Sequence, residues 1–278
     1  MKLITWNIQW GLGMDGRLDL ARIVAEARQF ADFDVLCLQE VADGFTDLEQ
    51  LAGENQFAQL AALLPEFTPV EGVAVDLPGP SGRRRRFGNM ILSRLPVGRI
   101  LQHALPWAAD NTTRSMPRSL LEIELEAEFG SVRIMTTHLE YFSAGLRGAQ
   151  VAAIRDIHRL AVLRSRQPPQ PGSGPYTSGK VPDATILTGD FNMRPDDPVK
   201  LSLSLPTGNV EGLFDAWGAL HPCTPHPPSF CIADQSYGPP HCCDFVLVSG
   251  SLVPRLREVA YQTETRASDH QPIIMELS

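Results

Sequence analysis

The chain has little cysteine for its length. Its 278 residues include five cysteines, and no two of them form a Cys-x-x-Cys pair. An odd count without such pairs argues against a zinc site and against a disulfide framework. Cys37 lies in a short apolar run and is expected in the core. The other four lie close enough in sequence to allow one disulfide, namely Cys223, Cys231, Cys242 and Cys243.

Long hydrophobic runs are missing as well. No apolar segment approaches the roughly 20 residues that cross a bilayer. Polar residues soon interrupt the N-terminus, residues 1–7, which excludes a signal peptide as the interpretation of this stretch. We therefore expect a cytoplasmic protein without a membrane segment, and no motif indicates a protein partner.

Basic residues are outnumbered. Lys and Arg total 24 against 32 Asp and Glu, which gives a formal net charge of -8. Proteins that bind long nucleic acids by counterion release usually carry a basic face. The acidic balance therefore argues against strong nonspecific binding to long polyanions, and it suits a site in which carboxylates hold a metal ion. Hydrophobic residues make up 43% of the chain, enough for a sizeable core.

Short β-type runs dominate the pattern, with helical periodicity in a few places. The runs of strand type cover residues 3–8, 34–38, 68–75, 89–93, 97–101, 120–125, 132–138, 184–188, 245–248, 258–261 and 272–277. Helices are predicted over 18–30, 46–64 and 145–166, a loop over 167–182, and an irregular stretch over 206–241. We expect one mixed α/β domain spanning 1–278, with two packed sheets and helices outside them.

Several predicted strands begin or end at a polar residue. Any one of these residues alone is more often a turn or structural group than a catalyst. Their number and their residue types change that balance, because together they suit one task. The eight positions are Asn7, Glu40, His138, Asp190, Asn192, Asp244, Asp269 and His270.

That task is hydrolysis of a phosphate ester, which needs an activated water and charge screening on the phosphate oxygens. Glu40 and Asp269 are natural ligands for a hard cation such as Mg²⁺, and Mn²⁺ is an alternative. Asp190 suits activation of the water. A protonated His270, paired with Asp244, can donate to the phosphate.

Seven motifs resemble the endonuclease/exonuclease/phosphatase superfamily, and they follow its order along nearly the whole chain. They are Thr5-Trp6-Asn7-Ile8, Leu38-Gln39-Glu40-Val41, Gly88-Asn89-Met90-Ile91-Leu92-Ser93, Thr137-His138-Leu139, Gly189-Asp190-Phe191-Asn192, Cys243-Asp244-Phe245 and Ser268-Asp269-His270. The resemblance implies a four-layer α/β sandwich, with two mixed β-sheets packed face to face and helices on the outside. It also implies an active site at one end of the sandwich.

The same resemblance implies individual roles. Glu40 becomes the principal metal ligand, with Asn7 and Asp269 beside the metal. Asp190 activates or orients the water. Asn192 and His138 contact the phosphate. The Asp244–His270 pair stabilises the transition state.

Four further features carry weaker expectations. Arg194 faces the phosphate if the chain follows the branch that resembles tyrosyl-DNA phosphodiesterases, and is otherwise a solvated loop residue. Tyr141 can reach the site or serve in packing, and Asn89 is expected to support the loop beneath the metal. The run Arg83–Arg86 is a solvated loop by default, although its position next to a site motif allows contact with a polyanionic substrate.

The motifs do not select the ester. Val41-Ala42 after Glu40 departs from the abasic-site endonucleases, and His241-Cys242-Cys243-Asp244-Phe245 departs from the inositol polyphosphate 5-phosphatases. A nuclease or phosphodiesterase acting on DNA, RNA or nucleotides is the leading hypothesis. A lipid or small-molecule phosphoesterase, of sphingomyelinase or phosphatase type, is the second. A non-catalytic binding scaffold is the third. This hypothesis predicts that at least one of the catalytic residues is missing, and none is missing from the chain.

Overall fold

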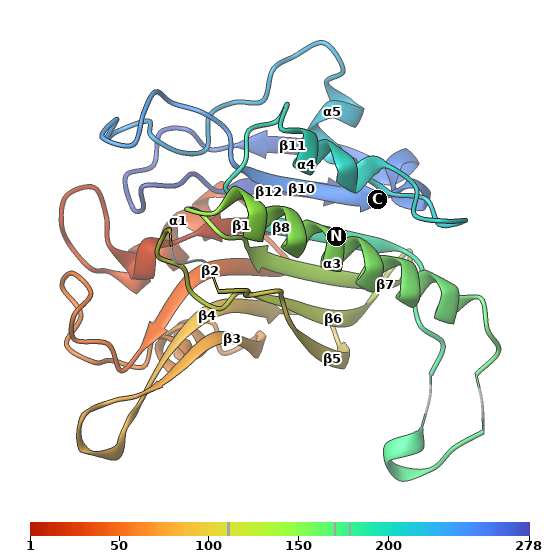
Figure 1. Cartoon of the computed structure of the whole chain (residues 1–278), viewed down its shortest axis with the longest axis horizontal. Helices are drawn as coiled ribbons and strands as arrows, with labels where there is room; N and C mark the ends of the chain where they lie inside the picture. The colour runs from red at the N-terminus through yellow and green to blue at the C-terminus, as the bar shows by residue number, and fades with distance from the viewer. Residues whose placement is uncertain (110–111, 170, 178) are drawn as a thin grey trace.

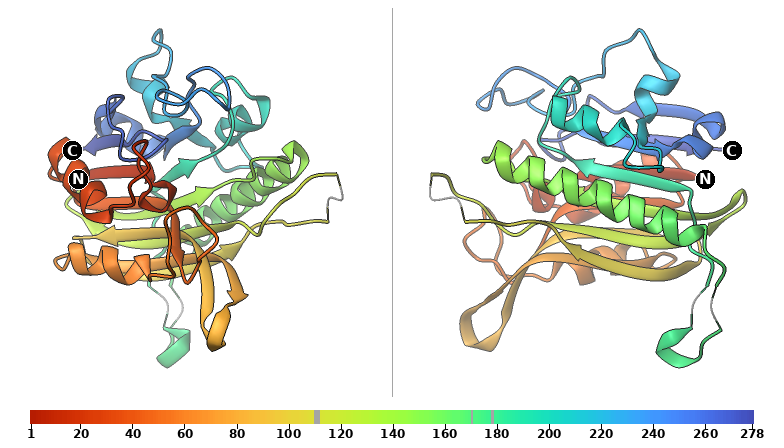
Figure 2. Two further views of the ribbon diagram at one scale, coloured as in Figure 1. Left: turned by 90° about the vertical axis from the view of Figure 1, so that its left-hand side faces the viewer. Right: turned by 45° about the vertical axis from the view of Figure 1, so that its right-hand side comes forward.

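Two six-stranded sheets pack face to face in a computed structural model of the chain, which describes residues 1–109, 112–169, 171–177 and 179–278 (Figure 1; Figure 2). The first sheet consists of β1 (Lys2–Asn7), β2 (Val35–Asp43), β3 (Thr68–Pro78), β4 (Arg84–Ser93), β11 (Leu256–Tyr261) and β12 (Ile273–Leu277). Their order across the sheet is β11-β12-β1-β2-β4-β3. The N-terminal and C-terminal strands are therefore neighbours.

The second sheet is built from the middle of the chain. Its strands are β5 (Val97–Ala104), β6 (Ser119–Ala127), β7 (Gly130–His138), β8 (Thr185–Asp190), β9 (Leu213–Asp215) and β10 (Asp244–Ser249). They lie in the order β5-β6-β7-β8-β10-β9. Strands β1 and β2 are parallel, as are β7 and β8, while the other neighbours are antiparallel. Both sheets are therefore mixed, as the resemblance implied.

Helices cover the outer faces of the sheets. The α-helices are α1 (Leu20–Phe30), α2 (Gln56–Leu63), α3 (Ala144–Ser165), α4 (Pro198–Leu201) and α5 (Ala216–Leu220). Short 3-10 turns are η1 (Gln9–Gly11), η2 (Pro80–Gly82), η3 (Gly174–Tyr176), η4 (Ser202–Ser204) and η5 (Gly250–Arg255). None of the helices in the described part of the chain has both the length and the hydropathy that a membrane span requires.

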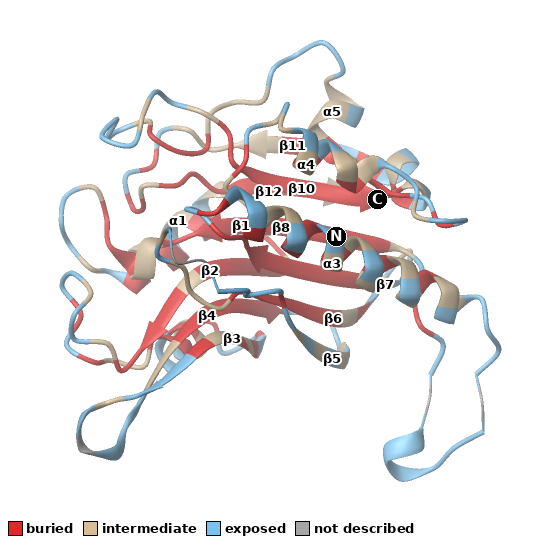
Figure 3. Ribbon diagram, viewed as in Figure 1, coloured by how far each residue is buried: buried red, intermediate tan, exposed pale blue. Residues whose placement is uncertain are grey.

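The alternation of side chains along each strand creates the layers. Leu3 of β1 packs into the core between the sheets, with residues such as Ile91 and Ile134. Its neighbour Ile4 points the other way and packs against α1 and α2. A third core joins the second sheet to α3. The central strands are accordingly buried, the edge strands β3 and β5 are partly exposed, and the outer surfaces of the helices are exposed (Figure 3). This arrangement confirms the predicted four-layer sandwich.

Several predicted boundaries were wrong. The helix expected over 46–64 begins only at Gln56, because Gly53 has a φ of 91° and the Asn55 side chain caps the helix by accepting from Ala58 N. The strand expected over 34–38 continues to Asp43. The irregular stretch over 206–241 contains β9 and α5. Of the predicted loop over 167–182, residues 170 and 178 lie outside the described residues.

The arginine run is not a solvated loop either. Arg84 begins β4, and its guanidinium lies 2.7 Å from Asp76. Arg85 pairs with Asp47 at 3.3 Å. The Asp76 and Asp47 carboxylates therefore compensate most of the positive charge of Arg84 and Arg85.

All five cysteines are free, so the possible disulfide does not form in this structure. Four of them are buried, and Cys223 is exposed.

Candidate active site

Polar ends of the central strands meet at one end of the sandwich. Asn7 ends β1, and its Nδ2 donates to Glu40 Oε1 of β2 at 3.0 Å and to Asp190 Oδ2 of β8 at 3.1 Å. Because β1 and β2 are parallel, and β7 and β8 are parallel, their carboxyl ends lie at common edges of the two sheets. His138 ends β7, with Nε2 3.4 Å from Asp190 Oδ2. Both sheets therefore contribute to one site.

The backbone is strained at two of these positions. Glu40 has a φ of 61°, and the register of β2 against β4 shifts between Leu38 and Val41, which marks an irregularity in the ladder. Asn192, in the loop after β8, has a φ of 51°. Non-glycine residues rarely adopt such values, and they cluster at functional sites. Glu40 is thus aimed into the site from within its strand, not from the strand's end as the sequence suggested.

His270 and Asp244 form a buried pair. His270 Nδ1 lies 2.8 Å from Asp244 Oδ2, and its Nε2 lies 3.6 Å from Asp190 Oδ2. Ser229 Oγ donates to Asp244 Oδ2 at 2.6 Å and accepts from the Asp244 amide at 3.1 Å. The Phe230 ring stacks on His270, with centroids 4.4 Å apart. Neither Ser229 nor Phe230 was singled out from the sequence, because both lie in the stretch predicted to be irregular.

Local charge sets the protonation of the two histidines. Burial alone would lower the pKa of His270, but the carboxylates of Asp244, Asp190 and Asp269 reverse this and raise its pKa well above the usual value. Burial and the charge of Arg118 lower the pKa of His138 to about 3. The site therefore pairs a cationic His270 with a neutral His138.

Glu40 and Asp269 are buried carboxyl groups whose negative charge is poorly compensated. Burial, followed by the charge of Asp269, raises the pKa of Glu40 to about 7, and burial also raises the pKa of Asp269. A divalent cation would relieve both effects, and carboxylate with amide oxygens suits a hard ion. The carboxylates of Glu40 and Asp269 therefore fit a metal ion. Asn7, expected beside the metal, turns its Nδ2 to Glu40 while its Oδ1 accepts from Gln9 N, so it is placed to orient Glu40 or a metal-bound water and not to offer its oxygen as a ligand.

A second group of potential ligands lies beside the first. Asp190, Cys243, Asp244 and His270 offer ligand atoms within 4.8 Å of one another. The Cys243 thiol is a poor ligand there, because burial raises its pKa well above the usual value. His270 is already held by Asp244, so the oxygen-rich group around Glu40 is the better site for a hard cation.

An arginine that sequence reasoning missed faces the site. Arg118 is only 6% exposed, and its Nε lies 3.6 Å from Glu140 Oε2. Its Nε and Nη1 have no hydrogen-bond partner among the described residues. Buried guanidinium groups without partners are costly. Arg118 lies just before β6, where no motif marked it, and only its position in the fold reveals it.

Of the weaker candidates, the structure brings Tyr141 to the site but not Arg194. Tyr141 lines the cleft described below and is 40% exposed. Arg194 is exposed, and the cleft lining in the described part of the chain includes Asn192 but not Arg194. Asn89 Nδ2 donates to Ser119 O at 3.3 Å and so links the two sheets, in keeping with a supporting role.

The site opens into a cleft of about 590 Å³, a size typical of small-ligand sites. Glu40, His138, Asp190, Asp269 and His270 all line it. One group of lining residues is apolar, and we call it the apolar wall: Trp10, Phe45, Leu48, Leu77, Phe87 and Met116. Another group is aromatic, and we call it the aromatic wall: Tyr141, Phe142, Phe230 and Tyr237. The cationic residues in the described lining are Arg114, Arg118 and His270.

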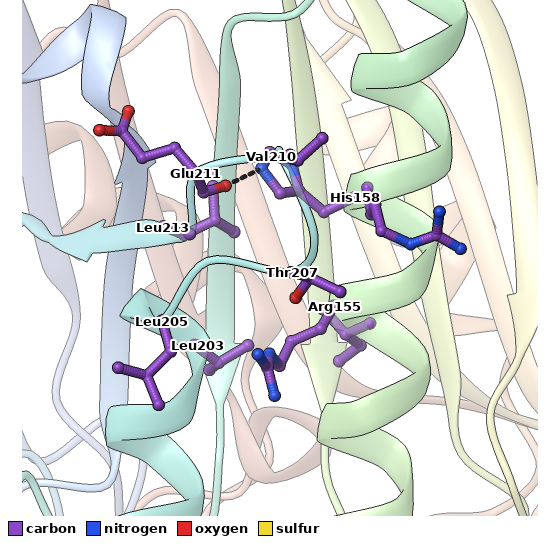
Figure 4. Close-up of a pocket in the computed structure, with 11 residues that line it drawn as sticks. Arg155, His158, Leu203, Leu205, Thr207, Val210, Glu211 and Leu213 are labelled. Carbon is purple, nitrogen blue, oxygen red and sulfur yellow. Dashed lines mark hydrogen bonds between the residues drawn. The ribbon is translucent and has the colours of Figure 1, made fainter.

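A second hollow lies between α3 and the segment 203–213 (Figure 4). His158 of α3 contacts Glu211 O through Nε2 at 3.2 Å. The hollow measures about 10 Å³, which leaves room for roughly one water. The side chains that line the hollow fill it almost completely, so it has no space for a substrate.

Solved structures share the fold. An endonuclease/exonuclease/phosphatase from Beutenbergia cavernae is 22% identical, with a TM-score of 0.66 over 99% of this chain and 70% of that chain. Truncated Caenorhabditis elegans TDP2 is 20% identical, with a TM-score of 0.65 over 99% and 95%. D. rerio TDP2 complexed with a single-strand DNA product is 19% identical, with a TM-score of 0.65 over 99% and 97%. At these identities the likeness establishes the fold alone.

No curated protein matches the sequence. A family model does, and its description is the endonuclease/exonuclease/phosphatase family, matched by residues 4–270. This range includes every residue that the site draws from the ordered motifs, from Asn7 to His270. The chain therefore belongs to the endonuclease/exonuclease/phosphatase family.

Proposed function

We propose that this phosphoesterase is a divalent-metal-dependent phosphodiesterase that acts on a nucleic acid or a nucleotide. The observation that carries the proposal is the arrangement around Asp190. Its Oδ2 lies within 3.6 Å of Asn7 Nδ2, His138 Nε2 and His270 Nε2. A carboxylate placed among three donors, beside a group suited to a metal, has the position that water activation requires.

Magnesium is the proposed ion, with manganese as the alternative. The family is divalent-metal-dependent, and the raised pKa values of Glu40 and Asp269 support a cation beside Asn7. When bound, such an ion screens the charge on the phosphate oxygens and lowers the barrier to attack. Glu40 and Asp269 would hold it, and Asn7 would orient Glu40 or a metal-bound water.

The chain's own residues account for proton and charge movements. Asp190 orients a water and accepts its proton as the water oxygen bonds to phosphorus. The ester P–O bond on the opposite side breaks, and the leaving oxygen takes up a proton from solvent. His270, kept cationic by Asp244, donates to a phosphate oxygen as negative charge grows.

Three further groups complete the phosphate site. His138 is neutral, so its single ring N–H, which faces Asp190 in this structure, would be shared between Asp190 and the bound phosphate. Asn192 presents an amide from the loop after β8. Arg118 contributes the buried positive charge, through Nη1, which has no hydrogen-bond partner among the described residues. Planar guanidinium groups suit phosphate oxygens well.

The aromatic wall supports a nucleotide substrate. Tyr141 and Tyr237 lie edge to face at 6.5 Å, and Arg114 lies 4.2 Å above the Phe142 ring. Exposed rings beside a phosphate site provide surfaces on which bases stack. The D. rerio TDP2 structure, which holds a single-strand DNA product, shows that this fold admits such a ligand.

A lipid or small-molecule phosphoesterase is the second candidate. The apolar wall favours it, because the cleft resembles a small-ligand pocket more than a long basic groove. A non-catalytic scaffold has no observation in its favour. The cytoplasmic location and the single domain over 1–278 stay predictions.

An activity panel with Mg²⁺ and Mn²⁺ tests the proposal. It would compare single-stranded and double-stranded DNA, RNA, a 5′-phosphotyrosyl oligonucleotide, sphingomyelin and inositol phosphates. The Asp190→Asn variant serves as the blank and should be slower by about 100-fold or more. Metal-independent turnover, or equal rates for the variant and the unchanged protein, would overturn the assignment.

A further inference from the structure

A buried carboxylate stands next to the arginine of the phosphate site. Glu140 comes shortly after His138, the last residue of β7, and it is fully buried. Arg118 lines the cleft, but Glu140 is not among the described residues of that lining. A buried charge is costly unless other charges or hydrogen bonds compensate it. The presence of Glu140 therefore calls for a role that involves no direct contact with a substrate.

The two carboxylate oxygens of Glu140 face different donors. Oε1 accepts from the Phe142 amide at 2.9 Å. Oε2 lies 3.6 Å from Arg118 Nε and has no hydrogen-bond partner among the described residues. A carboxylate accepts at both oxygens, so it can serve both donors at once. A glutamine has one acceptor oxygen, and it would turn its NH₂ group toward either the amide or the guanidinium.

Main-chain contacts fix the position of Glu140. Its amide donates to Gln150 Oε1 at 2.9 Å, and its carbonyl accepts from Arg147 Nη1 at 2.8 Å. Both partners belong to α3. Gln150 is itself fully buried, and its Nε2 donates to Pro106 O at 3.2 Å. Glu140 is therefore a rigid support, in contrast to a surface carboxylate that can follow its partner.

Charge supports the same role. Burial lowers the pKa of Arg118, and the carboxylate of Glu140, followed by those of Glu40 and Asp190, opposes this effect. In the proposed function Glu40 holds the metal and Asp190 activates the water. Glu140 has neither task, so it remains available as the partner of Arg118 when metal and substrate are bound.

Resting on the proposed function, we propose that Glu140 is a positioning residue that holds the Arg118 guanidinium toward the phosphate that is hydrolysed. The carboxylate faces Nε, and Nη1, which has no hydrogen-bond partner among the described residues, is left for the phosphate. The same carboxylate holds the Phe142 amide, and with it the turn that carries Tyr141 and Phe142 of the aromatic wall. One side chain thus sets the phosphate contact and the stacking surface relative to each other.

Binding of inorganic phosphate tests the inference without any chemical step. Its affinity for the Mg²⁺-loaded protein would be measured by ³¹P NMR titration. We expect Arg118→Met to weaken binding by about tenfold and Glu140→Gln by about fivefold, because one removes the charged contact and the other its support. The double variant should bind as Arg118→Met does, since Glu140 acts through Arg118.

Two results of this titration would overturn the inference. Independent effects would multiply to a loss of about 50-fold in the double variant. If Glu140 acted only through its negative charge, Glu140→Gln would leave phosphate binding unchanged or make it tighter, because a repelling charge is removed.

Further variants separate position from charge and from folding. Glu140→Asp keeps the charge but withdraws the oxygens by about 1.5 Å, and it should weaken phosphate binding by about threefold. It carries the test if Glu140→Gln does not fold, as judged by circular dichroism, and an unchanged affinity would contradict positioning. The control Glu124→Gln breaks a pair with Arg99 at 3.4 Å on the same sheet, outside the described cleft lining, and should leave the affinity unchanged. Equal losses at Glu124 and Glu140 would overturn the inference.

The outcome is separable from that of the proposed function. A protein that shows the expected binding pattern but hydrolyses no ester in the activity panel would retain the role of Glu140 and lose the proposed activity. A protein that hydrolyses phosphodiesters, and whose Glu140→Gln variant binds phosphate as the unchanged protein does, would do the reverse.

Discussion

His270 in the catalytic cleft and His158 in the hollow beside α3 are both buried, and they have opposite charge states. Burial, followed by the charge of Arg133, lowers the pKa of His158 to about 4. Burial acts on His270 in the same direction, yet the pKa of His270 rises well above its usual value. The desolvation penalty is common to both sites, so it does not explain the difference.

The difference comes from the groups that face each ring. His158 meets a backbone carbonyl, that of Glu211, and offers no net charge to a ligand. His270 is in contact with Asp244 and close to Asp190 and Asp269. His270 is cationic because three carboxylates gather around it, at a cost in stability that the site of His158 avoids.

The sharpest way to break this comparison is to remove each histidine. His270→Gln should lower kcat by about 100-fold or more, because it removes the cation that stabilises the transition state. His158→Gln should leave kcat within about twofold, since its ring acts in packing. Steady-state kinetics on one phosphodiester, with circular dichroism as a check of folding, measure both. Equal losses would mean that His270 has no special role.

Two arginines provide a second contrast. Arg118→Met should reduce kcat/KM by about 30-fold, because a buried cation beside the phosphate is lost. Arg194→Met is the matched control, and because Arg194 is exposed outside the cleft lining we expect less than about a twofold change. A larger effect for Arg194 would restore the role expected from the sequence.

The metal requirement should depend on Glu40 and on pH. Glu40→Gln should raise the Mg²⁺ concentration for half-maximal activity by about tenfold, whereas Glu258→Gln, an exposed position on β11, should not change it. The pKa of Glu40 without metal is about 7, so protons compete with the ion below that pH. In the unchanged protein, each unit of acidification below pH 7 should therefore raise the required Mg²⁺ by up to about tenfold. A requirement independent of pH would contradict this.

The smallest effect is expected at the arginine run. Changing Arg84 and Arg85 to Ser should alter KM by less than about twofold and leave its salt dependence unchanged, because both guanidinium groups pair with carboxylates. Measuring KM for an oligonucleotide across a series of salt concentrations tests this. A flatter salt dependence in the variant would show that the run meets the substrate after all.

The sequence predicted the layers and most of the site, since both follow from local patterns. Alternating apolar residues mark the strands, and the polar residues that end or begin them, such as Asn7 and Asp244, mark one edge of the sandwich. Helical periodicity failed at 46–64, because the apolar positions Leu48 and Leu51 pack into a small cluster with Phe87 instead of along a helix face.

Tertiary contacts explain what the sequence could not supply. Arg118 and Ser229 carry no motif, and each becomes part of the site through neighbours far away in the chain. The arginine run was expected to be a solvated loop by default, but Arg84 begins β4, and Arg84 and Arg85 pair with carboxylates that only folding brings near. The positions of Arg118 and Arg194 relative to the cleft likewise depend on loop paths that no periodicity describes.

The backbone at Glu40 has a consequence for stability. Its φ of 61° is one that glycine adopts at no steric cost and that a glutamate tolerates poorly. Glu40→Gly should therefore raise the melting temperature even as it removes the proposed metal ligand. Thermal stability and metal binding thus make opposite demands on this one position.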